Sequence, residues 1–276
     1  MEANGVTRRR VLGMAAQAGI VLAAAGIRPP LAHAAPGHGV DASLDTDLDV
    51  IVRNGTIYDG TLAEPYPADI GIRGDKIFAI GKITGRARWD IDAAGLIVTP
   101  GFIDVHTHCD LTFQRTGLKR YLAYAMPSWK GNHNYLYQGV TTVVTGNCGY
   151  GYTDSDYWLN LVHTIGFGTN VATLVPHGVI REKLFGADQR PELSPRELDA
   201  LKGRVADEMT KGALGFSTGL AYAPGWLSPT DELIAIAKVV RNYGGVYATH
   251  VRDETGNPTP KGGIGVLDAV SEAIEI

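Results

Sequence analysis

Two histidines at the end of an apolar stretch are the residues that first indicate chemistry. The stretch begins at Gly101, and it leads into His106 and His108. In a β-strand, alternate side chains point to the same face, so both imidazoles would lie on one side of the strand. Two converging neutral imidazoles are natural ligands for Zn²⁺. An isolated His-x-His pair is more often structural, but the apolar run and the Pro100-Gly101 break before it favour a metal site.

Polar residues that can bind a metal also follow two later predicted strands. Cys148 comes after the segment Thr141–Thr145, and His250 ends the segment Val246–His250. In a parallel barrel the carboxyl ends of the strands surround one pocket. A thiolate and three imidazoles would form a zinc site there.

Each of these residues also has a structural interpretation. Cys148 could be a small buried hydrophobic residue, or it could form a disulfide with Cys109, which would prevent it from binding a metal. His250 could be a hydrogen-bonded core histidine. Arg252 could serve only in an ion pair with a neighbouring carboxylate.

The chain from residue 100 onward alternates predicted strands with predicted helices. The strand candidates are Phe102–His106, Thr141–Thr145, Asn170–Val175, Leu214–Ser217 and Val246–His250. Two of the helices have clear start signals, since Ser194 and Ser228 are each followed by a proline and, three residues on, by an acid. The alternation predicts an α/β fold with a parallel sheet. Residues 100–276 hold about five of the eight strands of a (β/α)8 barrel, so we expect an incomplete barrel that stops within the domain.

The residues before the barrel predict three further segments. Residues 48–99 are rich in β signals and predict a small β-sandwich domain, with Asn54-Gly55 as a hairpin turn. Residues 1–34 resemble a twin-arginine export signal, because Arg8-Arg9-Arg10 precedes a run of small and apolar residues and Ala32-His33-Ala34 is typical of a cleavage site. The run is short and rich in Ala and Gly for a membrane anchor. Residues 35–47 are predicted to be a polar linker.

The composition is that of an ordinary soluble globular protein. The 276 residues are 45% hydrophobic, and the formal net charge is −4. This charge gives no support for binding to nucleic acid or to a membrane surface, so we expect neither partner once the export signal is removed. Two cysteines cannot form a disulfide framework. We expect a periplasmic or secreted protein.

Five segments together resemble the N-acyl-D-amino-acid deacylase (D-aminoacylase) family of the amidohydrolase superfamily. They are Asn54–Gly60, Pro100–His108, Gly139–Gly149, Phe216–Gly225 and Tyr247–Glu254. The resemblance implies a metal-dependent hydrolase with one or two Zn²⁺ ions. It assigns Cys148 and His250 to the tightly bound metal, and His106 and His108 to a second, weaker position. It places the general-base aspartate beyond residue 276, and it points to Tyr222 and Arg252 as substrate contacts.

The expected reaction is the hydrolysis of an N-acyl-D-amino acid to a carboxylate and a D-amino acid. A cyclic amidohydrolase of the hydantoinase or dihydroorotase type is an alternative. Many hydantoinases bridge two metals with a carboxylated lysine after the fourth strand, and residues 214–225 contain no lysine. A catalytically inactive part of a deacylase is the other alternative, because five strands cannot close a barrel.

Overall fold

The computed structural model describes residues 48–186, 191–258 and 265–276. The predicted export signal (1–34) and linker (35–47) lie outside these residues. The described chain divides into two compact units, with the boundary between Gly101 and Phe102. Among the described residues, no helix combines the length and the apolar character that crossing a membrane requires.

The first unit is built on one mixed β-sheet. Its strands are β1 (Leu48–Ile57), β2 (Tyr66–Arg73), β3 (Lys76–Gly81), β4 (Ala87–Asp92) and β5 (Ile97–Val98). They follow the order β3-β2-β1-β4, and β5 also pairs with β1. Leu48, Ile51 and Ile83 form a small buried core. The described strands of this unit form a single sheet, and the second layer of the predicted β-sandwich stays a prediction.

The predicted hairpin at Asn54-Gly55 is wrong, because β1 continues through both residues. The register against β2 shifts between Val52 and Gly55, which marks an irregularity of the β-bulge type. Asn54 has a φ of 59°, its N–H donates to Asp69 Oδ1 (2.9 Å), and its side chain donates to Asp92 Oδ1 (3.1 Å). Partners on both neighbouring strands therefore hold a turn-forming residue inside a strand.

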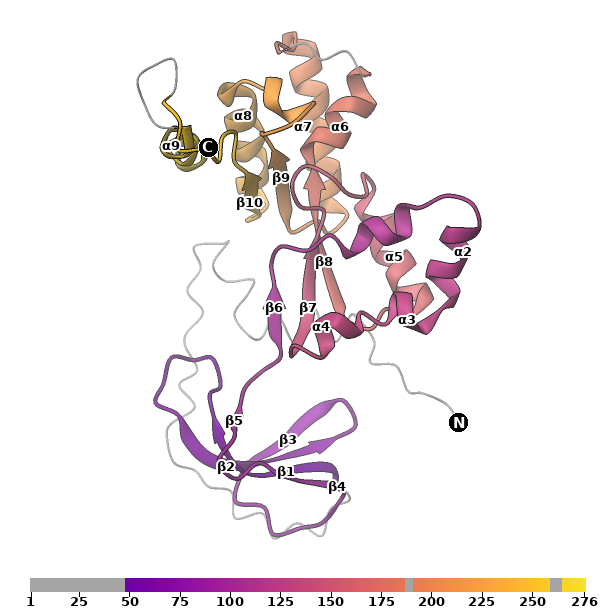
Figure 1. Cartoon of the computed structure of the whole chain (residues 1–276), viewed down its shortest axis with the longest axis vertical. Helices are drawn as coiled ribbons and strands as arrows, with labels where there is room; N and C mark the ends of the chain where they lie inside the picture. Colours follow the sequence, from indigo (N-terminus) through magenta and orange to yellow (C-terminus); the bar gives the residue numbers. More distant parts are fainter. Residues whose placement is uncertain (1–47, 187–190, 259–264) are drawn as a thin grey trace. The chain divides into compact units, whose positions relative to one another are not determined.

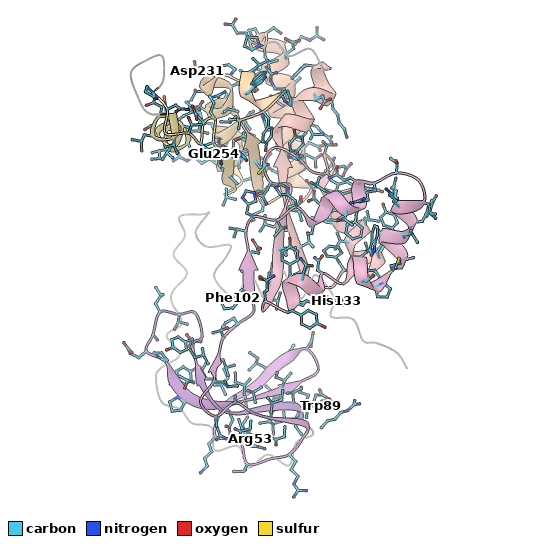
Figure 2. The ribbon with its side chains drawn as sticks, viewed as in Figure 1. Arg53, Trp89, Phe102, His133, Asp231 and Glu254 are labelled. Atoms are coloured by element: carbon cyan, nitrogen blue, oxygen red, sulfur yellow. The ribbon has the colours of Figure 1, made fainter. Side chains whose placement is uncertain are left out.

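The second unit contains five parallel strands that lie side by side in chain order (Figure 1). They are β6 (Phe102–Asp104), β7 (Val140–Thr145), β8 (Asn170–Pro176), β9 (Gly215–Gly219) and β10 (Val246–His250). This order, with each strand beside the next, confirms the predicted half-barrel sheet. β6 and β10 are its edge strands, and Phe102 on β6 is 57% exposed (Figure 2).

The first strand is shorter than the sequence predicted. β6 ends at Asp104, so His106 and His108 lie in the loop that follows it. Strand alternation therefore does not explain why their imidazoles converge. Contacts of the loop with β7, made by Thr107, bring them together instead.

Helices and short 3-10 segments connect the strands. They are η2 (Cys109–Gln114), α2 (Leu118–Ala125), α3 (Pro127–Lys130), α4 (His133–Leu136), α5 (Ser155–Ile165), α6 (His177–Phe185), α7 (Pro195–Thr210), η3 (Gly225–Leu227), α8 (Thr230–Asn242) and α9 (Gly265–Glu275). The predicted capping box at Ser194 and Glu197 is confirmed. At the other predicted start, Pro229 rather than Ser228 is the N-cap of α8.

Two apolar clusters attach these helices to the sheet. In one, Leu201 and Val205 of α7 and Ile236 of α8 pack with Phe216 of β9. In the other, Trp158 of α5 packs with Val143 of β7. Burial of these side chains stabilises the sheet and therefore fixes the ends of its strands, where the candidate metal ligands lie.

A buried ionic cluster links α6 to α8. Glu232 Oε1 accepts hydrogen bonds from His177 Nε2 (2.9 Å) and Arg181 Nε (3.1 Å), and all three side chains are at most 3% exposed. Burial alone would raise the pKa of Glu232, but the hydrogen bond and charge of His177, together with Arg181, outweigh it and lower that pKa.

Removing the Glu232 carboxylate is therefore expected to destabilise the fold. We expect Glu232→Gln to lower the free energy of unfolding by about 3 kcal/mol at pH 7, because the buried Arg181 loses its counter-charge. The stabilisation that Glu232 contributes in the wild type is fully present above the pKa that this residue has in the unfolded chain, near 4.5. It is lost as the pH falls through the lower pKa that Glu232 has in the folded protein.

Urea unfolding measured from pH 7 down to pH 3 tests this expectation. The difference between wild type and Glu232→Gln should shrink at the acid end. The control is Asp231→Asn in the exposed first turn of the same helix, which should cost less than about 1 kcal/mol. Equal effects of the two substitutions would contradict the assignment.

Candidate metal centre

Three of the predicted ligands converge in the structure. Their ligand atoms, on His106, His108 and Cys148, all lie within 4.8 Å of one another. His106 Nε2 lies 3.1 Å from Cys148 Sγ, and the two imidazole rings meet edge to face with centroids 5.4 Å apart. The loops after the adjacent strands β6 and β7 supply all three residues.

The loop that carries His106 and His108 is held by Thr107 and not by strand pairing. This residue is 3% exposed, and both its N–H and its hydroxyl donate to the Val144 carbonyl, at 3.1 and 2.8 Å. The Asn147 side chain donates to the same carbonyl (3.0 Å) and to the Val105 carbonyl (3.3 Å). Thr107 thus anchors the His-x-His loop to β7. No role was predicted from the sequence for Thr107 or Asn147, although both lie within the segments Pro100–His108 and Gly139–Gly149.

The donor set suits a borderline-soft cation such as zinc. His108 Nδ1 is buried and, within the described residues, has no hydrogen-bond partner. Burial, and after it the neighbouring His106, lowers the pKa of His108, which favours the neutral imidazole that binds metal. Two imidazoles and one thiolate are three protein ligands, and catalytic zinc sites have three with a further position left open.

Burial also sets the state of the cysteine. It raises the pKa of the Cys148 thiol, although a hydrogen bond from Tyr222 acts in the opposite direction. The thiol is therefore protonated at neutral pH before a metal binds, and metal binding would release the proton. Both cysteines are free, so the alternative of a Cys109–Cys148 disulfide is not realised.

His250 lies apart from the three converging ligands. In the sheet, β10 is separated from β7 by β8 and β9. The ring of Tyr222 meets the His250 ring edge to face at 5.2 Å, while its hydroxyl donates to the Cys148 carbonyl (2.8 Å). The structure thus brings Cys148 next to His106, and the shared metal that the resemblance implies for Cys148 and His250 stays a prediction.

Glu254 is a further neighbour of the site, and no role in metal binding was predicted for it from the sequence. Its Oε1 lies 3.4 Å from His250 Nε2, four residues earlier in the chain (Glu254 is labelled in Figure 2). Burial is the main cause that raises the pKa of the Cys148 thiol, and the negative charge of Glu254 raises that pKa further. The i, i+4 spacing to His250 was the signal that could have found it.

The two predicted substrate contacts differ in the structure. Tyr222 stacks on Tyr150 with centroids 5.3 Å apart, beside the candidate ligands. Arg252 instead holds α9 in place, since its guanidinium donates to Glu272 (2.9 and 2.8 Å) and to the carbonyls of Ser228 (2.9 Å) and Trp226. These bonds use four of the five N–H donors of Arg252 and give it a structural role here, while its predicted substrate contact stays a prediction.

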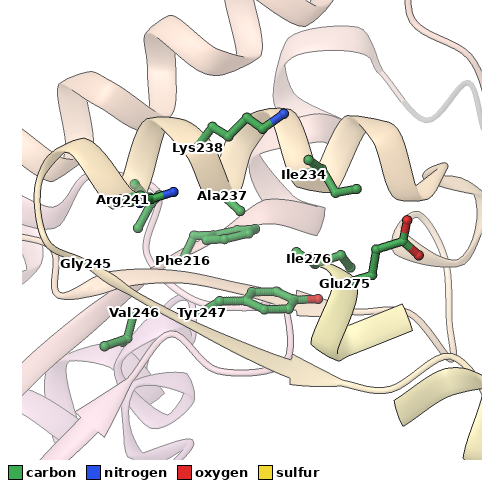
Figure 3. A pocket seen from close by; sticks show the side chains of 11 residues that line it. Phe216, Ile234, Ala237, Lys238, Arg241, Gly245, Val246, Tyr247, Glu275 and Ile276 are labelled. Atoms are coloured by element: carbon green, nitrogen blue, oxygen red, sulfur yellow. The ribbon is translucent and has the colours of Figure 1, made fainter. Parts of the chain in front are cut away.

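A cavity elsewhere in this unit contains none of the site residues. Its volume is about 350 Å³, and it lies between α8, β10 and the end of α9 (Figure 3). Phe216 and Tyr247, whose rings stack with centroids 4.7 Å apart, line it together with Lys238 and Glu275. It belongs to the layer between sheet and helices, and the candidate chemistry lies at the strand ends.

Comparison with known proteins identifies the family. Residues 91–260 match the amidohydrolase family. The chain belongs to this family. It is 32% identical over 231 residues to a D-aminoacylase and 36% identical over 231 residues to an N-acyl-D-glutamate deacylase, both from Alcaligenes xylosoxydans xylosoxydans. Each match covers 75% of this chain, and 45% and 44% of the relatives respectively. The chain thus spans about half the length of these curated relatives.

Solved structures agree with this family assignment. The N-acyl-D-glutamate deacylase of Bordetella bronchiseptica, determined with zinc and a phosphonate inhibitor, superimposes with a TM-score of 0.67 at 32% identity, over 83% of this chain and 49% of that one. A D-aminoacylase structure also gives 0.67 at 32% identity, over 83% and 48%. The L-hydantoinase of Arthrobacter aurescens shares the fold, with a TM-score of 0.53 at 19% identity, over 83% of this chain and 50% of that one.

The three converging side chains predict a cobalt-binding signature that depends on one cysteine. We expect Co²⁺ to give a thiolate-to-metal charge-transfer absorption in the wild type. Cys148→Ala should abolish it and weaken binding by more than the roughly 10- to 100-fold typical of losing an outer-shell partner. Cys109→Ala is the matched control and should keep the absorption, and an absorption that survives Cys148→Ala would contradict the site.

Proposed function

We propose that this chain belongs to a zinc-dependent hydrolase that converts an N-acyl-D-amino acid and water to a carboxylate and a D-amino acid. The convergence of Cys148 with the His106–His108 pair is the observation that carries the proposal. The relatives named D-aminoacylase and N-acyl-D-glutamate deacylase support it, since they are 32% and 36% identical to this chain.

His106, His108 and Cys148 are the residues that would hold a zinc ion, with His250 as the candidate for a second. When bound there, zinc supplies a lowered pKa for water and polarisation of the amide carbonyl. The contacts of Thr107 hold the histidine loop in place, and the lowered pKa of His108 favours the neutral imidazole that binds a metal. Tyr222 lines the site next to Cys148 and is a candidate substrate contact.

Two observations favour a linear amide over a cyclic one as substrate. The strand β9 and the residues up to Gly225 contain no lysine that could be carboxylated to bridge two metals. Cys148 instead supplies a ligand beside the histidine pair. The hydantoinase likeness, at 19% identity, concerns the fold alone.

Turnover by the purified protein tests the substrate class and the metal together. We expect zinc-loaded protein to release D-methionine from N-acetyl-D-methionine, or D-glutamate from N-acetyl-D-glutamate. A chelator should stop the release and added Zn²⁺ should restore it, while the L-enantiomers should react far more slowly.

Hydantoin and dihydroorotate are the comparison substrates. Turnover of these rings without turnover of the linear amides would overturn the proposal in favour of a cyclic amidohydrolase. Zinc binding without any turnover would favour the alternative that the chain by itself is a catalytically inactive part of such an enzyme.

We further propose export through the twin-arginine route to the periplasm. The support is the Arg8-Arg9-Arg10 cluster, the apolar run after it and Ala32-His33-Ala34. Changing both Arg8 and Arg9 to lysine should leave the protein in the cytoplasm at its full mass, whereas wild type should appear in the periplasm shortened by about 34 residues. Cytoplasmic retention of the wild type would contradict the proposal.

A further inference from the structure

The buried hydroxyl of Ser217 bridges the two ends of the loop that carries Cys148. Ser217, on β9, is completely buried, and its Oγ accepts a hydrogen bond from the Gly149 N–H at 3.0 Å. The same hydroxyl donates to the Gly146 carbonyl. Ser217 therefore bonds to the backbone on both sides of Cys148, from a strand that lies 68 residues further along the chain.

The loop has a conformation that requires such support. Cys148 has a φ of 58°, and Gly146 and Gly149 have φ values of 76° and 72°. Glycine adopts these angles freely, but an L-residue such as cysteine pays an energetic cost in the left-handed region. A Cβ on Gly146 would lie 2.3 Å from the Leu174 carbonyl oxygen, so the loop is packed tightly against β8. Without the hydrogen bonds from Ser217, the backbone of Cys148 would be free to adopt an extended conformation.

Two further bonds hold the same loop from neighbouring elements. The Val179 N–H of α6 donates to the Gly149 carbonyl (3.2 Å), and the Tyr222 hydroxyl donates to the Cys148 carbonyl (2.8 Å). Together with Ser217 they provide partners for the carbonyls of Gly146, Cys148 and Gly149 and for the Gly149 N–H. The Cys148 side chain makes its contact on the other side, where Sγ lies 3.1 Å from His106 Nε2.

We propose that Ser217 is the positioning residue of the metal centre. It holds the Gly146–Gly149 loop so that the Cys148 thiolate stays within reach of the metal that His106 and His108 bind. Ser217 is completely buried and its hydroxyl bonds only to the backbone of this loop among the described residues, so it would act through the position of Cys148. The inference rests on the proposed metal centre, and it adds a residue from a third strand to the support of that centre.

Cobalt titration of the full chain tests the inference without relying on activity. Ser217→Ala is expected to weaken Co²⁺ binding about 10- to 100-fold and to reduce the thiolate-to-cobalt absorption per bound ion. Ser217→Thr keeps the hydroxyl and should retain most of both signals. The matched control is Ser155→Ala, because Ser155 is 1% exposed and its hydroxyl has no hydrogen-bond partner among the described residues.

A double-mutant cycle with Cys148→Ala separates positioning from general structural support. If Ser217 acts through Cys148, Ser217→Ala should add no further loss of affinity once the thiol is gone. Equal losses in both backgrounds would overturn the inference, as would an unchanged absorption in Ser217→Ala. Unfolding of both Ser217 variants would also overturn it, because the serine would then support the sheet as a whole.

The wild type distinguishes this inference from the proposed function. Wild-type protein that binds no Co²⁺ would overturn the metal centre and the role of Ser217 with it. Wild-type protein that binds Co²⁺ through Cys148, together with an unaffected Ser217→Ala, would overturn the role of Ser217 and leave the metal centre standing.

Discussion

The candidate site depends on a single backbone carbonyl, that of Val144 near the end of β7. It accepts three hydrogen bonds, from the N–H and the hydroxyl of Thr107 and from the side-chain amide of Asn147. Thr107 lies between the two histidines, and Asn147 precedes Cys148. This carbonyl therefore ties the histidine loop and the cysteine loop to the same point of the sheet. Because it is a backbone group of a buried strand, packing of the whole unit determines its position.

This arrangement leaves the ligand atoms available for a metal. Backbone groups and the small side chains of Thr107, Asn147 and Ser217 make the hydrogen bonds that shape the loops. His108 Nδ1 stays without a hydrogen-bond partner among the described residues. Burial keeps the Cys148 thiol protonated until a metal competes for it. A site held by its surroundings loses little conformational freedom when an ion binds, which favours affinity.

The sequence predicted the strands better than the contacts between their ends. The five parallel strands follow from the alternation of apolar segments with capped helices, and both signals are local in the chain. The hairpin at Asn54-Gly55 failed, because Asp69 and Asp92 on neighbouring strands stabilise a bulge there. The length of β6 also differed, because the N–H of His106 donates to the Asp104 side chain (3.1 Å) instead of continuing the strand. The first difference arises from residues that are distant in sequence, and the second from a local contact that the apolar pattern does not reveal.

The sequence by itself determined the family, the parallel α/β fold and the residues that can bind a metal, because residue types, spacing and hydrophobic periodicity are properties of the chain alone. Only the tertiary structure decided which of those residues meet. The strand order places β6 beside β7 and so joins His106 to Cys148, while two strands separate β7 from His250. Arg252 was assigned to substrate from its motif, but Glu272 of α9 occupies its guanidinium. Such pairings depend on distances in space, which the spacing of residues along a chain does not specify.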